Sequence, residues 1–242
     1  MKNKLNNSYD NKGIVFEGKD LEVQQDWDIY WTDQNQTSGK LYDFFADFYR
    51  NNIIKKALNH FLLKHFTKGQ ELLHAGCGSG KVDTDVVDNF QVTALDISLP
   101  ALKIYDAVNQ HKAKIVQASI FEMPFEDETF DGIYDLGVIE HFTEDEIQQI
   151  LMEFKRVLKK NGKICLFIPP TYGLTVKVLD TAHFILNKIL RKNRKLHPDE
   201  ITRVRSKAHI KTIIEKAGFS FIEYYFGPND LFTQIVIVGE KK

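Results

Sequence analysis

Three glycines at alternate positions mark the first candidate ligand site. They are Gly76, Gly78 and Gly80, and they follow the apolar run Glu71–Ala75 closely. Because glycine has no Cβ, such a loop turns tightly and brings its backbone close to a ligand. By itself the loop is also compatible with a tight turn that binds nothing.

An acidic residue after the next apolar run adds a second feature. Asp96 closes the run Gln91–Leu95 and lies 20 residues after Gly76. A carboxylate at this place can accept hydrogen bonds from the vicinal hydroxyls of a ribose, as in dinucleotide-binding folds. Asp96 alone is also compatible with a helix cap, but its pairing with the glycine loop favours a nucleotide-like ligand.

The glycine spacing separates two classes of cofactor. A nicotinamide dinucleotide site needs Gly-x-Gly-x-x-Gly, with the third glycine in the helix that faces the pyrophosphate. In this chain the third glycine is Gly80, and position 81 is a lysine. A nicotinamide enzyme is therefore disfavoured, and a comparison of ligand binding would decide the question.

The segments that must position these residues alternate between strand and helix. Apolar runs predict strands at 71–75, 91–95, 114–118, 130–136, 163–168, 220–226 and 232–239. Alternation of strands with helices is typical of right-handed βαβ units and a parallel sheet. The short link between the last two strands favours an antiparallel pair at one edge.

Helix signals lie between these strands. Ser98 is a predicted N-cap, and Thr143-Glu144-Asp145-Glu146 is a capping box. The box opens a helix whose apolar stripe runs from Ile147 to Leu158 and which is expected to stop at Asn161-Gly162. A last helix is predicted at Ile210–Ala217.

Two further regions flank this pattern. Residues 1 to about 20 are polar and predicted to be loose, whereas 27–49 are rich in aromatic residues, with helical spacing from Leu41 to Tyr49. A second helix is predicted at Ile53–Phe66. We therefore expect residues 1–66 to form a tail and an N-terminal helical region, and 67–242 to form the ligand-binding domain.

Several segments together resemble the class I S-adenosylmethionine-dependent methyltransferases, over about Glu71 to Pro169. The glycine loop resembles the first motif of that family. The other matching segments are Leu95–Ser98, Ala118–Ile120 with Met123–Phe125, Phe130–His141 and the turn Leu158–Lys163. Each piece alone is weak, but the set is specific.

This resemblance implies a fold, a cofactor and site residues. The fold is α/β: a three-layer αβα sandwich with a mostly parallel seven-stranded sheet, an antiparallel last strand, an N-terminal helical lid and a helical insertion after the fifth strand. The cofactor is S-adenosyl-L-methionine, and its product is S-adenosyl-L-homocysteine. The residues implied to bind it are Ala75, Gly76, Cys77, Gly78, Asp96, Ile97, Ser119, Ile120 and Leu136. Asp96 would hold the ribose, Ile97 would touch the adenine, and Ser119 would stand where many relatives have an aspartate for the adenine amino group.

Methyl transfer needs orientation, and a base only where the acceptor loses a proton. The family pattern places His141 as the candidate base, although it is also compatible with a structural histidine beside the capping box. Tyr30, Trp31 and Tyr42 are candidates for a lid over cofactor and acceptor, or for anchoring of the N-terminal helix. His74 is expected to be a packed core residue, and nucleophilic catalysis by Cys77 is disfavoured.

A basic segment, at about 171–206, is longer than a crossover requires. It combines a helical apolar stripe with Arg191, Lys192, Arg194 and Lys195. It is compatible with a lid, with a binding site for an acidic glycan-linked or nucleotide-sugar acceptor, and with peripheral contact to a membrane that carries a lipid-linked acceptor. Nucleic-acid binding is disfavoured because aromatic residues are not interleaved with the basic ones.

The composition limits the classes of protein to which the chain can belong. The chain has 242 residues, a net charge of -1, 43% hydrophobic residues and two cysteines. These values predict a globular cytoplasmic protein. The cysteines have no metal-ligand spacing, the first residues are polar, and no run approaches the roughly 20 apolar residues of a membrane span, so no metal site, signal peptide or membrane span is expected. We therefore expect a methyltransferase that acts by O- or N-methylation on a small-molecule, glycan-linked or lipid-linked acceptor. The alternative is a non-catalytic regulatory or assembly protein that binds the same cofactor; the pattern leaves the oligomeric state open.

Overall fold

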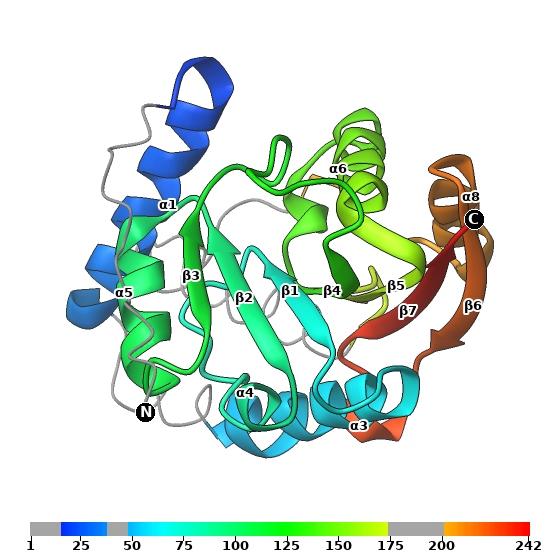
Figure 1. Ribbon diagram of the computed structural model, residues 1–242, viewed down its shortest axis with the longest axis horizontal. Helices are drawn as coiled ribbons and strands as arrows, with labels where there is room; N and C mark the ends of the chain where they lie inside the picture. The colour runs from blue at the N-terminus through cyan, green and yellow to red at the C-terminus, as the bar shows by residue number, and fades with distance from the viewer. Residues whose placement is uncertain (1–15, 38–47, 174–200) are drawn as a thin grey trace, which may run out of the picture.

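The fold is built around one seven-stranded sheet with the order β3-β2-β1-β4-β5-β7-β6 (Figure 1). The structure is a computed structural model, and it describes residues 16–37, 48–173 and 201–242. The strands are β1 (Glu71–Ala75), β2 (Gln91–Asp96), β3 (Lys114–Gln117), β4 (Phe130–Leu136), β5 (Leu158–Ile168), β6 (Phe219–Tyr225) and β7 (Ile235–Lys241). β1 to β5 pair in parallel, and β7 runs antiparallel to both β5 and β6. The predicted mixed sheet is therefore confirmed.

Helices cover both faces of the sheet. The helical elements are α1 (Gly18–Thr37), η1 (Arg50–Ile54), α3 (Lys55–His65), α4 (Val86–Asn89), α5 (Leu99–Val108), η2 (Ile139–His141), α6 (Glu144–Val157), α8 (Lys207–Lys216) and η4 (Pro228–Asp230). One apolar core joins the sheet to α6 and α8, and the other joins it to α3, α4 and α5. In β4, Ile133 belongs to the first core and its neighbour Tyr134 to the second, because successive strand side chains point to opposite faces. The result is the three-layer arrangement expected from the sequence.

Local capping fixes where two of the helices begin. The Ser98 hydroxyl accepts a hydrogen bond from the Ala101 N–H, and Thr143 and Glu146 form the reciprocal capping box of α6. Such caps satisfy backbone N–H groups that have no partner inside the helix. Both predicted helix starts are confirmed, and they set the positions of the loops that follow β2 and β4.

The predicted boundary between α6 and the next strand was wrong. The helix ends at Val157, and β5 already begins at Leu158, which pairs with Phe130 of β4. The pairing then shifts register between Phe130 and Gly132, and Asn161 adopts a φ of 61° within the irregular stretch. Pairing with β4 therefore converts the expected turn Leu158–Lys163 into a bulged start of the strand.

The N-terminal region differs from the prediction in where its helix begins. α1 starts at Gly18, so residues 18–20 are helical rather than loose. Most of the predicted helical stretch from Leu41 to Tyr49 lies outside the described residues, as does 174–200 within the predicted insertion. In the part of the chain that is described, no helix combines the length and apolar character needed to cross a membrane.

Candidate cofactor and acceptor site

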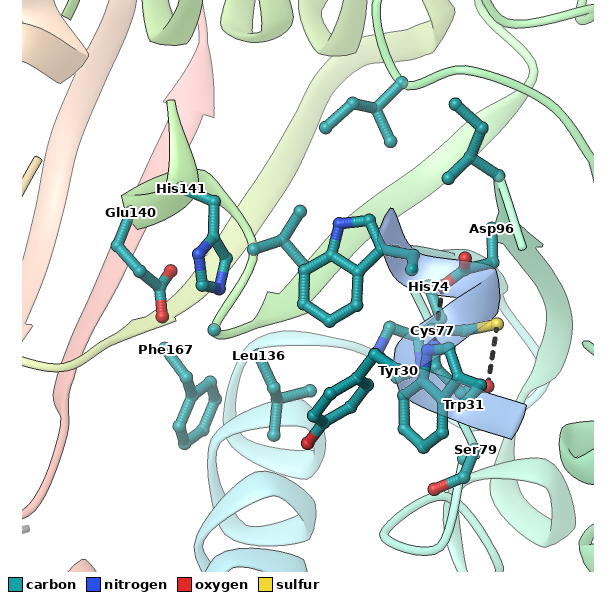
Figure 2. A pocket seen from close by; sticks show the side chains of 18 of the residues that line it. Tyr30, Trp31, His74, Cys77, Ser79, Asp96, Leu136, Glu140, His141 and Phe167 are labelled. Atoms are coloured by element: carbon teal, nitrogen blue, oxygen red, sulfur yellow. Dashed lines mark hydrogen bonds between the residues drawn. The ribbon is translucent and has the colours of Figure 1, made fainter. Parts of the chain in front are cut away.

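A cavity of about 410 Å³ lies at the carboxyl ends of β1, β2, β3 and β4 and is covered by α1 (Figure 2). Its volume falls within the usual range for small-molecule sites. The strand order arranges its lining from the residues after β3, through Asp96 at the end of β2, to the glycine loop after β1 and then to η2 after β4. Figure 2 shows Asp96 at one end and Glu140 with His141 at the other.

Asp96 and the glycine loop are joined directly. The Gly78 N–H donates to Asp96 Oδ2 over 2.8 Å, and the Ser98 N–H donates to Asp96 Oδ1 over 2.8 Å. Burial raises the pKa of Asp96 above its ordinary value, and these two hydrogen bonds oppose the rise because they stabilise the carboxylate. Each oxygen keeps a second lone pair that can accept from a ribose hydroxyl. The two Asp96 oxygens are thus held in place as hydrogen-bond acceptors that face the cavity.

The glycines of the loop are required by close neighbours as well as by backbone angle. Gly76 and Gly78 have φ values of +67° and +51°, in the left-handed region that favours glycine. A Cβ on Gly76 would lie 2.6 Å from a methyl carbon of Val138, and one on Gly78 would lie 2.7 Å from the ring of Trp31. The absence of side chains at Gly76 and Gly78 therefore lets Val138 and Trp31 pack directly against the loop.

The thiol of Cys77 lies inside this loop but is not activated. Cys77 is buried, and burial raises the pKa of its thiol well above the ordinary value, with the nearby charges of Asp96 and Asp83 adding to the rise. A thiolate is the nucleophilic form of cysteine. The loop contributes its backbone to the site and not a reactive sulfur.

The residues expected around an adenine ring lie at the β2 and β3 end of the cavity. Ile97, Ser119 and Ile120 all line it. The Ser119 hydroxyl oxygen accepts a hydrogen bond from the Phe121 N–H over 3.2 Å. Its second lone pair remains suited to an amino hydrogen of the ligand. These side chains form an apolar slot with one polar edge.

Helix α1 closes the cavity through contacts at several points. Asp28 accepts a hydrogen bond of 2.6 Å from the Ser98 hydroxyl, and the rings of Trp27 and His141 meet edge-on with centroids 5.3 Å apart. Lys19, near the start of α1, forms an ion pair with Glu146 of α6. Trp31 lies over Gly78. The helix thus bridges the glycine loop and the η2 end of the cavity.

The η2 end carries two titratable side chains. Glu140 and His141 both line the cavity, and Glu140 is only 4% exposed. The backbone carbonyl of Glu140 accepts hydrogen bonds from Ile201 and Thr202, over 2.8 and 2.9 Å. This end therefore carries groups that can hold a proton, and its backbone is hydrogen-bonded directly to the described C-terminal part of the predicted insertion.

The structure gathers most of the predicted site residues. Those that line the cavity are Tyr30, Trp31, Gly76, Cys77, Gly78, Asp96, Ile97, Ser119, Ile120, Leu136 and His141. Ala75 is fully buried in β1 and does not line the cavity, and Tyr42 lies outside the described residues. No group of His, Cys, Asp or Glu side chains among the described residues is arranged to hold a metal ion.

Sequence reasoning missed several lining residues. They are Tyr49 and Arg50 before α3, His74 in β1, Glu140, Phe167 at the end of β5 and Gln234 before β7. Glu140 could have been found from its place beside His141. The others come from segments that only the folded sheet brings to the same edge, so their spacing in the chain carries no signal.

Known proteins that resemble this chain include methyltransferases. A family model described as a methyltransferase domain matches residues 73–166. An uncharacterized protein of Methanocaldococcus jannaschii is 33% identical over 109 residues, which cover 44% of this chain and 45% of that protein. The matched part of the chain thus spans about half the length of that relative. A ubiquinone/menaquinone biosynthesis C-methyltransferase of Blochmanniella pennsylvanica is 28% identical over 198 residues, covering 69% and 74% of the two chains.

Solved structures share the fold. The crystal structure of magnesium protoporphyrin IX methyltransferase from Synechocystis PCC 6803, with bound S-adenosylhomocysteine, has a TM-score of 0.65 and 15% identity, covering 92% of this chain and 99% of that one. The glycine loop, the matched domain and this shared architecture agree with one another. Residues 73–166 thus match a methyltransferase-domain family, and the chain shares the fold of S-adenosylmethionine-dependent methyltransferases.

Proposed function

We propose that this protein transfers the methyl group of S-adenosylmethionine to a small-molecule acceptor held between η2 and α1. The observation that carries the proposal is one continuous cavity lined by Asp96 and the glycine loop as well as by Glu140 and His141. A pure cofactor-binding protein would need only the first set. The second set supplies a place for a reacting partner beside the same loop.

The residues present suit S-adenosylmethionine. Ile97, Ser119 and Ile120 would hold its adenine, Asp96 its ribose, and the backbone of Gly76 to Gly80 its amino-acid part. When bound, this cofactor supplies an electrophilic methyl group on a sulfonium and leaves as S-adenosylhomocysteine. The protein contributes orientation and exclusion of water, which α1 provides by covering the cavity.

His141 is the proposed general base. It lines the cavity from η2, where an acceptor oxygen or nitrogen can lie between it and the cofactor loop. Such an acceptor forms its bond to the methyl carbon with a lone pair and releases its proton, which the His141 imidazole accepts. Trp27 packs edge-on against the imidazole and restricts its orientation.

Aromatic side chains favour a planar acceptor. Trp27, Tyr30, Phe121, Phe142 and Phe167 line the cavity. Aromatic rings stack on flat ligands and enclose them without demanding polar groups. The names of the quinone-biosynthesis relative and of the protoporphyrin enzyme also describe flat, conjugated small molecules. We infer an aromatic or conjugated acceptor with an ionisable hydroxyl or nitrogen.

A second candidate is a glycan-linked or lipid-linked acceptor approached through the basic segment. Pro170 bridges to Val204, and Ile201 and Thr202 donate to the Glu140 carbonyl, so both described ends of the segment meet at the acceptor end of the cavity. Arg205 and Lys207 follow there and are exposed. Peripheral contact with an anionic membrane would use the same charges.

Transfer of a labelled methyl group tests these alternatives. The full chain would be incubated with methyl-labelled S-adenosylmethionine and separate fractions of small metabolites, lipids and glycans, with His141→Ala as the matched control. We expect label in a small conjugated metabolite, and much less with the variant. Label in the lipid or glycan fraction favours the second candidate. Binding of S-adenosylhomocysteine without label in any fraction would favour a non-catalytic regulatory or assembly protein.

A further inference from the structure

A buried polar cluster lies beneath the glycine loop. Asp83 Oδ2 accepts hydrogen bonds from the hydroxyls of Tyr105 and Tyr134, over 2.6 and 2.8 Å, and lies 2.6 Å from His74 Nδ1. None of these four side chains is more than 2% exposed. Burial raises the pKa of Tyr105 and Tyr134 well above the ordinary value, and the charge of Asp83 adds to it, so both remain hydrogen-bond donors.

The cluster fixes the orientation of the His74 ring. The imidazole stacks on Tyr134 with centroids 4.4 Å apart and an interplanar angle of 28°. Because a carboxylate only accepts hydrogen bonds, His74 Nδ1 must be the donor to Asp83. Nε2 lies on the opposite edge of an imidazole and therefore faces away from Asp83. His74 also lines the cavity, although sequence reasoning expected it to be a packed core residue.

The free-energy cost of burying the Asp83 carboxylate indicates that the cluster does more than pack the core. Asp83 is fully buried, and its Oδ1 has no hydrogen-bond partner among the described residues. A buried carboxylate with an unsatisfied oxygen destabilises a fold unless another interaction offsets the loss. Two apolar side chains would join β1 to the loop at lower cost. A negative charge held behind a cavity-facing imidazole is suited to attract a cation in the cavity.

The position of His74 along the cavity indicates which part of a ligand it meets. β1 lies between β2, which carries Asp96, and β4, which leads to His141. With the ribose at Asp96 and the acceptor at His141, the amino-acid part of the cofactor lies over β1. This step rests on the proposed function, because it takes S-adenosylmethionine as the ligand.

We propose that His74 binds the α-ammonium group of the cofactor, with Asp83 as the positioning residue behind it. In the neutral imidazole, Nδ1–H donates to Asp83 and Nε2 accepts from the ammonium, which is a donor only. The Asp83 carboxylate behind the imidazole supplies a negative charge that complements the ammonium. The α-carboxylate would find no donor at Nε2 in this tautomer.

A pair of amide variants separates this role from a purely structural one. The amide of His74→Asn matches the position of Nδ1 and can keep the contact with Asp83, but it leaves nothing at Nε2. The carbonyl of His74→Gln reaches the position of Nε2 and can still accept from the cavity. If His74 only held Asp83 in place, Asn would be the replacement that better preserves ligand affinity. If His74 binds the ammonium group, Gln would be the better replacement.

Calorimetry would compare S-adenosylhomocysteine with 5′-methylthioadenosine, which lacks the amino-acid part. We expect His74→Asn to lower the affinity for S-adenosylhomocysteine about 10-fold, a loss typical of one hydrogen bond to a charged group. The affinity for 5′-methylthioadenosine should stay unchanged. We expect His74→Gln to recover most of that loss. His111, an exposed residue 2.7 Å from Asp106, provides a matched histidine–aspartate control as His111→Asn.

Three results would overturn the inference: parallel weakening of both ligands, wild-type affinity in His74→Asn, or Asn outperforming Gln. If both variants fail to fold, nitrogen NMR of the wild-type histidines decides. The His74 Nε2 signal should then move with S-adenosylhomocysteine and stay with 5′-methylthioadenosine, and equal movement with both would refute the contact. Failure of the wild-type chain to bind either ligand would instead refute the proposed function.

Discussion

Gly78 and Asp96 lie 18 residues apart and are joined by a 2.8 Å hydrogen bond from the glycine N–H to the carboxylate. The bond joins the glycine loop to the Asp96 carboxylate, the proposed ribose ligand. A change at either residue therefore affects the other.

Replacement of Asp96 by asparagine is expected to lower the affinity for S-adenosylhomocysteine by roughly 10- to 100-fold, because hydrogen bonds to a charged group contribute about 1.5–3 kcal/mol. Alanine should cost at least as much, since it also removes the acceptor for Gly78 and Ser98. Calorimetric titration measures both. Asp88→Asn, at an exposed ion pair with Lys112, is the control. Unchanged affinity in Asp96→Ala would remove the basis for the ribose assignment.

Replacement of Gly78 by alanine is expected to lower the affinity for S-adenosylhomocysteine, because the new methyl group meets the Trp31 ring. Gly69→Ala separates this clash from backbone strain. Gly69 also has a positive φ, of +87°, but its Cβ would meet nothing within 4 Å. Both variants should lose about 1 kcal/mol of folding stability, whereas only Gly78→Ala should lose affinity. Equal affinity in the two variants would show that the Trp31 contact is immaterial.

Replacement of His141 by asparagine is expected to lower kcat by roughly 10²- to 10⁴-fold, the usual contribution of a general base. The affinity for S-adenosylhomocysteine should stay unchanged, because His141 lies at the far end of the cavity from Asp96. The pH profile of kcat should also lose its acidic limb. A variant that keeps the wild-type profile would identify His141 as a structural residue.

Asp135 is expected to make stability depend on pH. Burial raises its pKa from 3.8 to about 8. Between these values the folded state keeps a proton that the unfolded state has lost, so this contribution is full below the lower value and disappears as pH rises through the upper one. The free energy of unfolding should fall by up to about 1.4 kcal/mol per pH unit in that range.

Urea denaturation of the wild type and Asp135→Asn across the same pH range checks this expectation. The difference between the two curves isolates the contribution of Asp135, because the other titratable groups are shared. The variant should show a flatter dependence. Parallel curves would mean that the Asp135 carboxyl is ionised in the folded protein.

Features set by neighbouring residues were predictable from the sequence. The Ser98 cap and the Thr143–Glu146 box depend on backbone groups three residues away, and both form as expected. β1 and β4 begin and end at the predicted residues. The mostly parallel seven-stranded sheet with an antiparallel last strand followed from the family resemblance and the alternation of strands with helices, whereas the order of the strands was not predicted.

Features set by tertiary pairing were not predictable. The start of β5 depends on Leu158 meeting Phe130, and no local signal marks that contact. The same holds for His74 and Asp83, whose pairing requires the turn of the glycine loop between them. A histidine in an apolar strand is usually a packed residue, so only the folded loop reveals its second contact.

Both tryptophans of the chain, Trp27 and Trp31, belong to α1, one against His141 and the other over Gly78. Selective excitation of indole therefore reports on this helix and on nothing else in the protein. Emission from the unlabelled chain should register ligand binding beside the loop and beside η2 in the same titration, without attaching a dye.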